Sequence, residues 1–231
     1  MPSSVLAVLM LLAAHPVTYL GRLVTVVDPG TEGPGGFYPK GEAKVCVQGR
    51  EEKDCYKAPE GFGRMPGLSV VELRKGELAL FFEAASGGVS GWSVHFALLK
   101  FCDRDQFPCG VGELRNLLPY GLAVSNQSRH ALWELPEISD SKVFLTAYGV
   151  WGPREAHYSD HRCIVSVYVR RPDDFDGLSY YLADQFMSIR SYGYKNGELD
   201  DVLGAERQEI LARLKRVKAS WPQETKSIKP E

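Results

Sequence analysis

Apolar and polar residues alternate along many short stretches of this chain, and that alternation restricts the fold more than any other feature. In the clearest stretch, residues 164–170, three valines would share one side of the backbone and the residues between them the other. Such a half-solvated pattern is typical of antiparallel strands. The sequence therefore predicts strands at 19–27, 43–47, 68–73, 78–84, 95–101, 143–150 and 164–170, with two short ones at 179–186 and 188–194.

Turn residues and one helical stretch complete the predicted fold. The chain has 23 glycines and 14 prolines, more than a helical protein tolerates, and many of them fall in predicted loops at 29–40 and 57–67. Between 205 and 218, apolar residues such as Ile210 and Leu214 recur at helical spacing, and basic residues gather near the end. We therefore predict a mostly β protein of antiparallel sheet units, arranged as propeller-like blades or as a sandwich or barrel, with one C-terminal amphipathic helix.

Composition divides the chain into four segments. The apolar run from Val5 to Ala14 is about ten residues long, which suits a secretory signal and is too short for a membrane span. A buried first strand or helix is the alternative interpretation of this run. We expect no transmembrane span and a location outside the cytoplasm, secreted or periplasmic. The predicted organisation is a signal segment at 1–16, a β-rich domain at 17–203, a C-terminal helix packed on it at 204–220 and a disordered tail at 221–231.

The five cysteines are consistent with an oxidising compartment. Cys46 and Cys55 flank a polar stretch with the character of a hairpin turn, and Cys102 and Cys109 flank a loop of turn-forming residues. Two local disulfides are therefore predicted, and free buried thiols are the alternative. Cys163 remains unpaired in this scheme and begins an apolar strand, so we expect an inert core thiol there.

The charge balance limits the classes of partner. The formal net charge is −2 at pH 7, and the basic residues are scattered except in the last helix. A nucleic-acid partner is not expected, because no basic stripe would attract the phosphates. The expected partner is an unidentified protein or a glycan, and the expected assembly is a monomer or a small homo-oligomer.

Glu155, His157 and His161 form the main candidate for chemistry. In an extended segment, residues two apart share a face, so one carboxylate and two imidazoles would line up and hold zinc with an open position for water. The spacing is not His-Glu-x-x-His, however, and the Ser-Asp pair before His161 is typical of a turn. We favour a hydrogen-bonded polar network that fixes a loop against the sheet, with no catalytic role assigned and zinc as the only cofactor considered.

His95, Trp151 and Tyr158 are candidate ligand-binding residues. His95 follows a glycine-rich loop at 87–91, but a strand rather than a helix comes next, so the loop lacks the geometry that cradles phosphate. Trp151 and Tyr158 flank the histidine segment, where an exposed aromatic ring would stack on a sugar or contact a partner. Cross-strand packing within the sheet is the alternative use of these rings.

Four short motifs resemble those of a group of uncharacterised exported bacterial proteins rich in β structure. They are Gly-Gly-x-Ser-Gly at 87–91, Leu-x-Asn-Leu-Leu-Pro at 114–119, Trp-x-Leu-Pro at 133–136 and Glu-x-His-x-x-x-His-Arg at 155–162. The resemblance extends over residues 40–216. It implies export and a β-rich fold, and it implies no activity.

A unit of strand, polar loop and strand occurs twice, at 78–101 and at 143–169. The unit is similar to the blades of FG-GAP or integrin-like propellers. Those blades carry an Asp-x-Asp-x-Asp-Gly calcium loop, which this sequence lacks. The nearest segment, 173–177, has neither the spacing nor the closing acid and is predicted to be a hairpin turn.

Three functions remain open at this stage. The favoured one is an exported binding or structural module whose polar loop near residues 151–161 contacts a partner. The first alternative is a metal-assisted hydrolase that uses Glu155, His157 and His161. The second alternative is an inhibitor or assembly partner in the cell envelope, with the final helix as its docking element.

Overall fold

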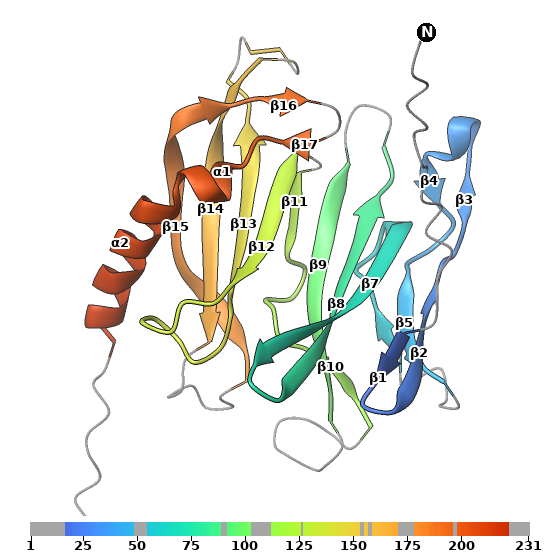
Figure 1. Cartoon of the computed structure of the whole chain (residues 1–231). Helices are drawn as coiled ribbons and strands as arrows, with labels where there is room; N and C mark the ends of the chain where they lie inside the picture. The colour runs from blue at the N-terminus through green and yellow to red at the C-terminus, as the bar shows by residue number, and fades with distance from the viewer. Residues whose placement is uncertain are drawn as a thin grey trace, which may run out of the picture.

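The alternating stretches form antiparallel strands, as predicted, and the described strands build three larger sheets that stack face to face and two small ones, β3-β4 and β16-β17. In Figure 1 the layers follow one another from α2 at the left to β1 and β2 at the right. The computed structural model describes residues 17–48, 55–88, 92–102, 112–125, 127–152, 155–156, 159–170, 178–195 and 198–221. The predicted signal segment at 1–16, the predicted turn at 173–177 and residues 222–231 of the predicted tail lie outside the described residues.

The first sheet, here called the N-terminal sheet, begins with a hairpin where a single strand at 19–27 was predicted. Leu20 and Gly21 have φ angles of 49° and 71°, the left-handed backbone that two-residue hairpin turns require. The sheet has the order β1-β2-β5-β6, and a small hairpin of β3 and β4 occupies the predicted loop at 29–40. The elements are β1 (Val17–Tyr19), β2 (Arg22–Val27), β3 (Thr31–Glu32), η1 (Pro34–Gly36), β4 (Tyr38–Pro39), β5 (Lys44–Val47) and β6 (Tyr56–Lys57).

The central sheet contains the longest deviation from prediction. Its edge strand β7 begins at Phe62, inside the stretch 57–67 that was predicted to be a loop. Register shifts near Arg64 and Gly67, and a positive φ at Met65, interrupt the alternation there and conceal the strand. The order is β10-β9-β8-β7, and β11 also pairs with β9. The elements are β7 (Phe62–Arg74), β8 (Glu77–Ser86), β9 (Ser93–Phe101), β10 (Leu114–Asn116) and β11 (Ala123–Ser125).

The C-terminal sheet has the order β12-β13-β14-β15. The two short strands predicted at 179–186 and 188–194 are largely one continuous strand, β15, whose two register shifts against β14 break the pattern. The strands β10, β11 and β12 were not predicted, because each is short or only partly buried. The elements are β12 (Ser128–Trp133), β13 (Val143–Val150), β14 (His161–Arg170), β15 (Tyr180–Tyr192), β16 (Tyr194–Lys195), β17 (Glu198–Leu199), α1 (Val202–Ala205) and α2 (Arg207–Ala219).

Three apolar cores join the layers. One face of the central sheet, including Phe82, packs on the N-terminal sheet. The opposite face packs on the C-terminal sheet, where the rings of Phe81 and Phe96 lie 6.0 and 5.8 Å from the ring of Phe144. The far face of the C-terminal sheet is covered by α1 and α2. The predicted fold class is therefore confirmed, with the sheets stacked as in a sandwich.

The apolar stripe of the last helix is already used inside the protein. Ile210 and Leu214 are fully buried against the C-terminal sheet. The third hypothesis, an envelope partner that docks through the final helix, would therefore have to use the polar side of α2. No helix in the described part of the chain is long and apolar enough to span a membrane.

The strand–loop–strand unit that was predicted to occur twice, at 78–101 and 143–169, corresponds to two strand pairs, one in the middle of each of two sheets. Strands β8 and β9 form the middle of the central sheet, and β13 and β14 form the middle of the C-terminal sheet. The two pairs face each other across the aromatic core described above. Each pair must be apolar over most of its length, because both are covered by neighbouring layers.

A largely buried carboxylate, that of Glu77, connects the central sheet to the C-terminal sheet. Glu77, the first residue of β8, lies 2.6 Å from Nε of Arg74, 2.8 Å from Nζ of Lys100 and 3.0 Å from Nη1 of Arg170. Arg170 ends β14 and is only 3% exposed. Burial alone would raise the pKa of Glu77, but hydrogen bonds from Arg170 and Lys100 lower it to about 2. The carboxylate is therefore ionised at any physiological pH.

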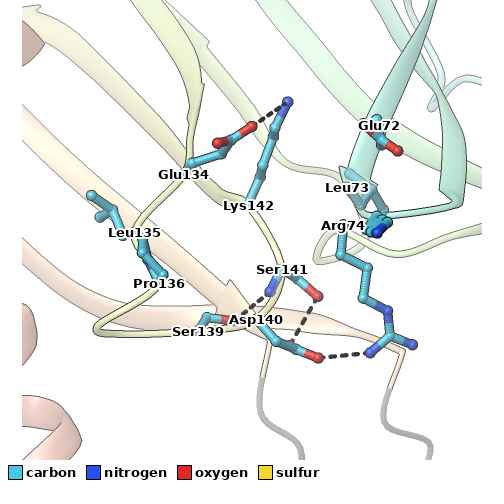
Figure 2. Close-up of a pocket in the computed structure, with 11 residues that line it drawn as sticks. Glu72, Leu73, Arg74, Glu134, Leu135, Pro136, Ser139, Asp140, Ser141 and Lys142 are labelled. Carbon is cyan, nitrogen blue, oxygen red and sulfur yellow. Dashed lines mark hydrogen bonds and ion pairs between the residues drawn. The ribbon is translucent and has the colours of Figure 1, made fainter.

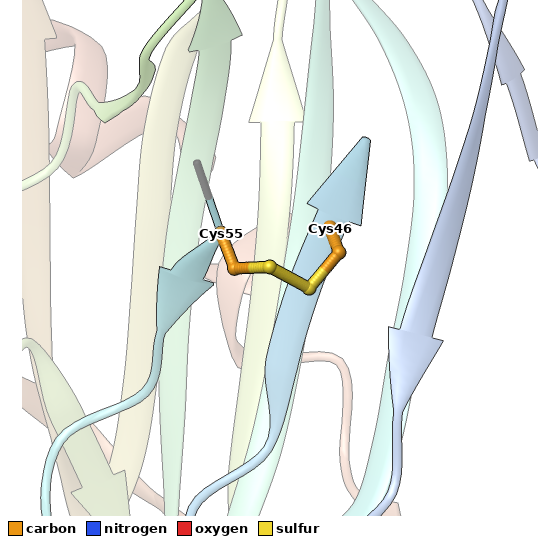
Figure 3. The surroundings of a disulfide bond; sticks show 2 residues. All are labelled: Cys46 and Cys55. Atoms are coloured by element: carbon orange, nitrogen blue, oxygen red, sulfur yellow. A yellow bond between two sulfur atoms is a disulfide. The ribbon is translucent and has the colours of Figure 1, made fainter. Parts of the chain in front are cut away.

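One of the two predicted disulfides is present. Cys46 in β5 is bonded to Cys55, just before β6, across a sequence separation of 9 (Figure 3). Cys102 is also disulfide-bonded, and its predicted partner Cys109 lies outside the described residues. Cys163 is the free cysteine and is buried.

We expect thiol counting on the unreduced, denatured protein to give one free thiol, that of Cys163. Three thiols would contradict one of the two bonds, and five would contradict both.

Replacing Cys46 and Cys55 together by Ser should lower the free energy of unfolding by about 2–3 kcal/mol, because the unfolded chain loses a short loop constraint. Urea unfolding measures this change, and an unchanged midpoint would argue against the constraint.

Candidate functional site

Glu155 and His161 meet where the chain passes from β13 to β14. Oε2 of Glu155 lies 2.8 Å from Nδ1 of His161, which begins β14 and is 1% exposed. The same oxygen accepts a hydrogen bond of 2.9 Å from the backbone N–H of Gly152. These bonds, that of Gly152 first, lower the pKa of Glu155. The ionised carboxylate therefore pins the start of the loop to the first residue of the following strand.

His161 has one ring nitrogen engaged and one unused. A carboxylate only accepts hydrogen bonds, so Nδ1 of His161 is the donor to Glu155. Nε2 is buried and has no hydrogen-bond partner among the described residues. The arrangement resembles the orienting half of a catalytic carboxylate and histidine pair, but in the described residues no nucleophile contacts Nε2.

Trp151 lies beside this pair and reaches the surface. Its indole Nε1 donates a hydrogen bond of 3.1 Å to Oε1 of Gln127, and its ring lies 5.7 Å from the ring of His161. Gln127, just before β12, is itself held because its carbonyl accepts from the N–H of Gly149 in β13. Trp151 is nevertheless 40% exposed. The sheet therefore presents a fixed aromatic side chain to solvent.

The segment between the two strands turns rather than extends. The N–H of Ser159 donates to the carbonyl of Ala156, and the N–H of Ala156 donates to Oγ of Ser159. The single shared face that would align a zinc site is therefore not formed by the described part of this loop. His157 and Tyr158 lie outside the described residues. Within the described residues, no group of three or more His, Cys, Asp or Glu side chains is placed to hold a metal.

His95 occupies the core between the N-terminal and central sheets. Nδ1 of His95 donates to the carbonyl of Leu122 at 2.8 Å, and Nε2 accepts from the hydroxyl of Tyr56 at 2.9 Å. Burial lowers the pKa of His95 to about 4. Both ring nitrogens are hydrogen-bonded within the protein and the side chain is fully buried. His95 therefore has no ring nitrogen left to contact a ligand in this conformation.

Cys163 is similarly enclosed. It lies in β14 with no exposed surface, and burial, followed by the nearby charges of Glu206 and Asp200, raises its thiol pKa to about 12. A thiol with such a pKa carries no thiolate at neutral pH. Cys163 is therefore an inert core thiol in this conformation, in agreement with the expectation for it.

A cleft that sequence reasoning missed lies at the opposite end of β13. It has a volume of about 550 Å³ and lies between the β7–β8 turn and the loop from β12 to β13 (Figure 2). Two contacts join its walls, from the N–H of Lys142 to the carbonyl of Leu73 and from Arg74 to Asp140. No local pattern joins the two segments, because Arg74 and Asp140 are 66 residues apart in sequence.

Comparison with known proteins does not assign either site. No protein-family model, curated protein or solved structure matches the chain.

The protonation of His95 should make the protein less stable in acid. The unfolded chain binds a proton at this residue below a pH of about 6.5, whereas the folded protein does so only near pH 4. The contribution of His95 to the free energy of unfolding is therefore fully present above about pH 6.5, the pKa of histidine in the unfolded chain. It is lost as the pH falls toward 4, by up to about 3 kcal/mol. Urea unfolding of the wild type and of His95→Gln at several pH values between these limits measures it.

The comparison concerns the slope with pH, since His95→Gln also changes stability at neutral pH. The variant should lose clearly less stability than the wild type on acidification. Equal losses in the two proteins would show that His95 is not the group responsible.

Proposed function

We propose that this protein is an extracytoplasmic glycan-binding module whose main contact is Trp151. The observation that carries the proposal is that Trp151 remains 40% exposed although Gln127 fixes its indole N–H and His161 packs beside its ring. An aromatic ring of this kind can stack on the apolar face of a sugar ring. An exposed ring with a fixed orientation is the feature that such stacking requires.

The neighbouring loop supports this role because it is held in place before any ligand arrives. Glu155 links Gly152 to His161 by two hydrogen bonds, and Ser159 closes the turn through Ala156. A side chain that is already ordered loses little conformational entropy on binding, so less of the contact energy is spent on ordering. In this proposal the hydrogen bonds of Glu155 with Gly152 and His161 hold the surroundings of Trp151 in place.

The polar surroundings of Trp151 favour a sugar over a protein. Protein interfaces gather several buried aromatic or aliphatic anchors at their centre. Trp151 instead contacts the amide of Gln127 and the ring of His161, and His161 is hydrogen-bonded to the carboxylate of Glu155, which is 44% exposed at its side chain. The hydrogen bonds of Glu155 with Gly152 and His161 both go to Oε2, so within the described residues Oε1 can accept a hydroxyl group.

The location outside the cytoplasm is supported by the sulfur chemistry. The bond between Cys46 and Cys55 closes a short hairpin, and Cys102 is disulfide-bonded as well. Such structural bonds persist in oxidising compartments and are rare in reducing ones. The apolar run from Val5 to Ala14 has the length of a secretory signal.

Calorimetric titration with soluble oligomers of glucose and of N-acetylglucosamine tests the proposal. The wild type should bind at least one of them, and Trp151→Ala should raise the Kd by about tenfold or more, which corresponds to about 1.4 kcal/mol. Glu155→Ala should raise the Kd by a smaller factor, because the ring remains while the loop loses its support.

Tyr120→Ala is the matched control, since Tyr120 is 90% exposed between β10 and β11, away from this loop. It should bind like the wild type. Equal affinities for the wild type and Trp151→Ala would remove Trp151 from the site. If no oligomer binds while capture of a protein depends on Trp151, a protein partner replaces the glycan.

A further inference from the structure

We propose that the cleft at the other end of β13 binds a short peptide or a similar zwitterion, a molecule that carries both an ammonium and a carboxylate group. The cleft is lined by residues before β13, whereas Trp151 follows it, so the two sites lie at opposite ends of one strand. This inference is independent of the proposed glycan site. Failure of either test would leave the other unaffected.

The size and shape of the cleft suit a small ligand. Its volume of about 550 Å³ falls within the range of about 300–1,000 Å³ that is typical of small-molecule sites. Figure 2 shows Leu73 on one side and Leu135 with Pro136 on the other, and of these three only Pro136 is exposed to the space, because Leu73 and Leu135 are buried in the cores. An aliphatic part of a ligand would pack on Pro136.

The charges that line the cleft give no net attraction to ligands of a single sign. Three cations face three anions, so the lining has a formal net charge of +3 − 3 = 0. A polyanion or a polycation would meet as much repulsion as attraction. A molecule with one charge of each sign finds a complementary group at each of its ends. The cations are Arg74, Lys75 and Lys142, and the anions are Glu72, Glu134 and Asp140.

The ion pairs around the opening are of unequal strength. Arg74 contacts Asp140 at 2.8 Å and Glu77 at 2.6 Å, so its guanidinium is committed to the framework. Lys142 and Glu134 lie 3.4 Å apart, a long contact, and the side chain of Glu134 is 79% exposed. The structure therefore assigns the ligand carboxylate to Lys142 and the ligand ammonium to Glu134, whose exposed carboxylate makes only this long contact within the described residues.

The cleft is formed before a ligand arrives. The N–H of Lys142 donates to the carbonyl of Leu73 at 2.6 Å, which joins the two walls through their backbones. Oγ of Ser139 accepts from the N–H of Ser141 at 3.1 Å and shapes the loop between them. Because these contacts fix both walls, binding requires little ordering of the protein.

Titration with leucyl-alanine, followed by backbone amide NMR and calorimetry, tests the proposal on the full chain. The amide signals of Leu73 and Lys142 should shift in the wild type. Acetylating the amino end or amidating the carboxyl end of the dipeptide should each raise the Kd by about tenfold. Unchanged amide signals, or equal affinity for the free and blocked dipeptides, would overturn the proposal.

Two variants assign the charges. Lys142→Gln should bind the free and the amidated dipeptide equally weakly, and Glu134→Gln should do the same for the free and the acetylated dipeptide. Glu137→Gln, in the same loop but outside the lining, is the control and should bind like the wild type. If Lys142→Gln fails to fold, the exposed Glu134 carries the test alone. Wild-type affinity in Glu134→Gln would then overturn the assignment.

Discussion

The carboxylate of Glu77 is the interaction on which the arrangement of the central and C-terminal sheets depends. It begins β8 and accepts from cations at the ends of β7 and β14 and within β9, so one side chain fixes three other strands. Removing a carboxylate from water is costly, and only a full set of charged partners offsets that cost. Arg170 reaches it from the C-terminal sheet and is almost completely buried. The relative position of the sheets is therefore encoded in a polar cluster as well as in the aromatic core.

Both candidate sites take their geometry from this stacked frame. The cleft has one wall on the central sheet and the other on the C-terminal sheet, so its width follows from how the two sheets are held. Trp151 stands at the far end of β13, where it contacts Gln127, just before β12, and His161, the first residue of β14. Each proposed site is assembled at one end of β13 from side chains that contacts with other segments hold in place.

The sequence predicted what regular alternation encodes and missed what long-range contacts create. Strands such as 143–150 were predicted correctly because they are uninterrupted runs of apolar, β-branched and aromatic residues, whereas the register shifts in β7 concealed half of that strand. The pairing of Glu155 with His161 was accessible because the residues are close in sequence and chemically complementary. The cleft and the Glu77 cluster were not accessible, because their members come together only when distant segments pack, as Glu77 and Arg170 do across 93 residues.

A double-mutant cycle on Glu77 and Arg170 tests the central claim most directly. Urea unfolding near neutral pH would compare the wild type with Glu77→Gln, Arg170→Met and the double variant. Breaking a buried ion pair from one side leaves an uncompensated charge, so each single change should cost about 3–5 kcal/mol. The double change should cost clearly less than the sum of the two. Single variants within about 0.5 kcal/mol of the wild type, or strictly additive losses, would contradict the claim that this pair holds the sheets together.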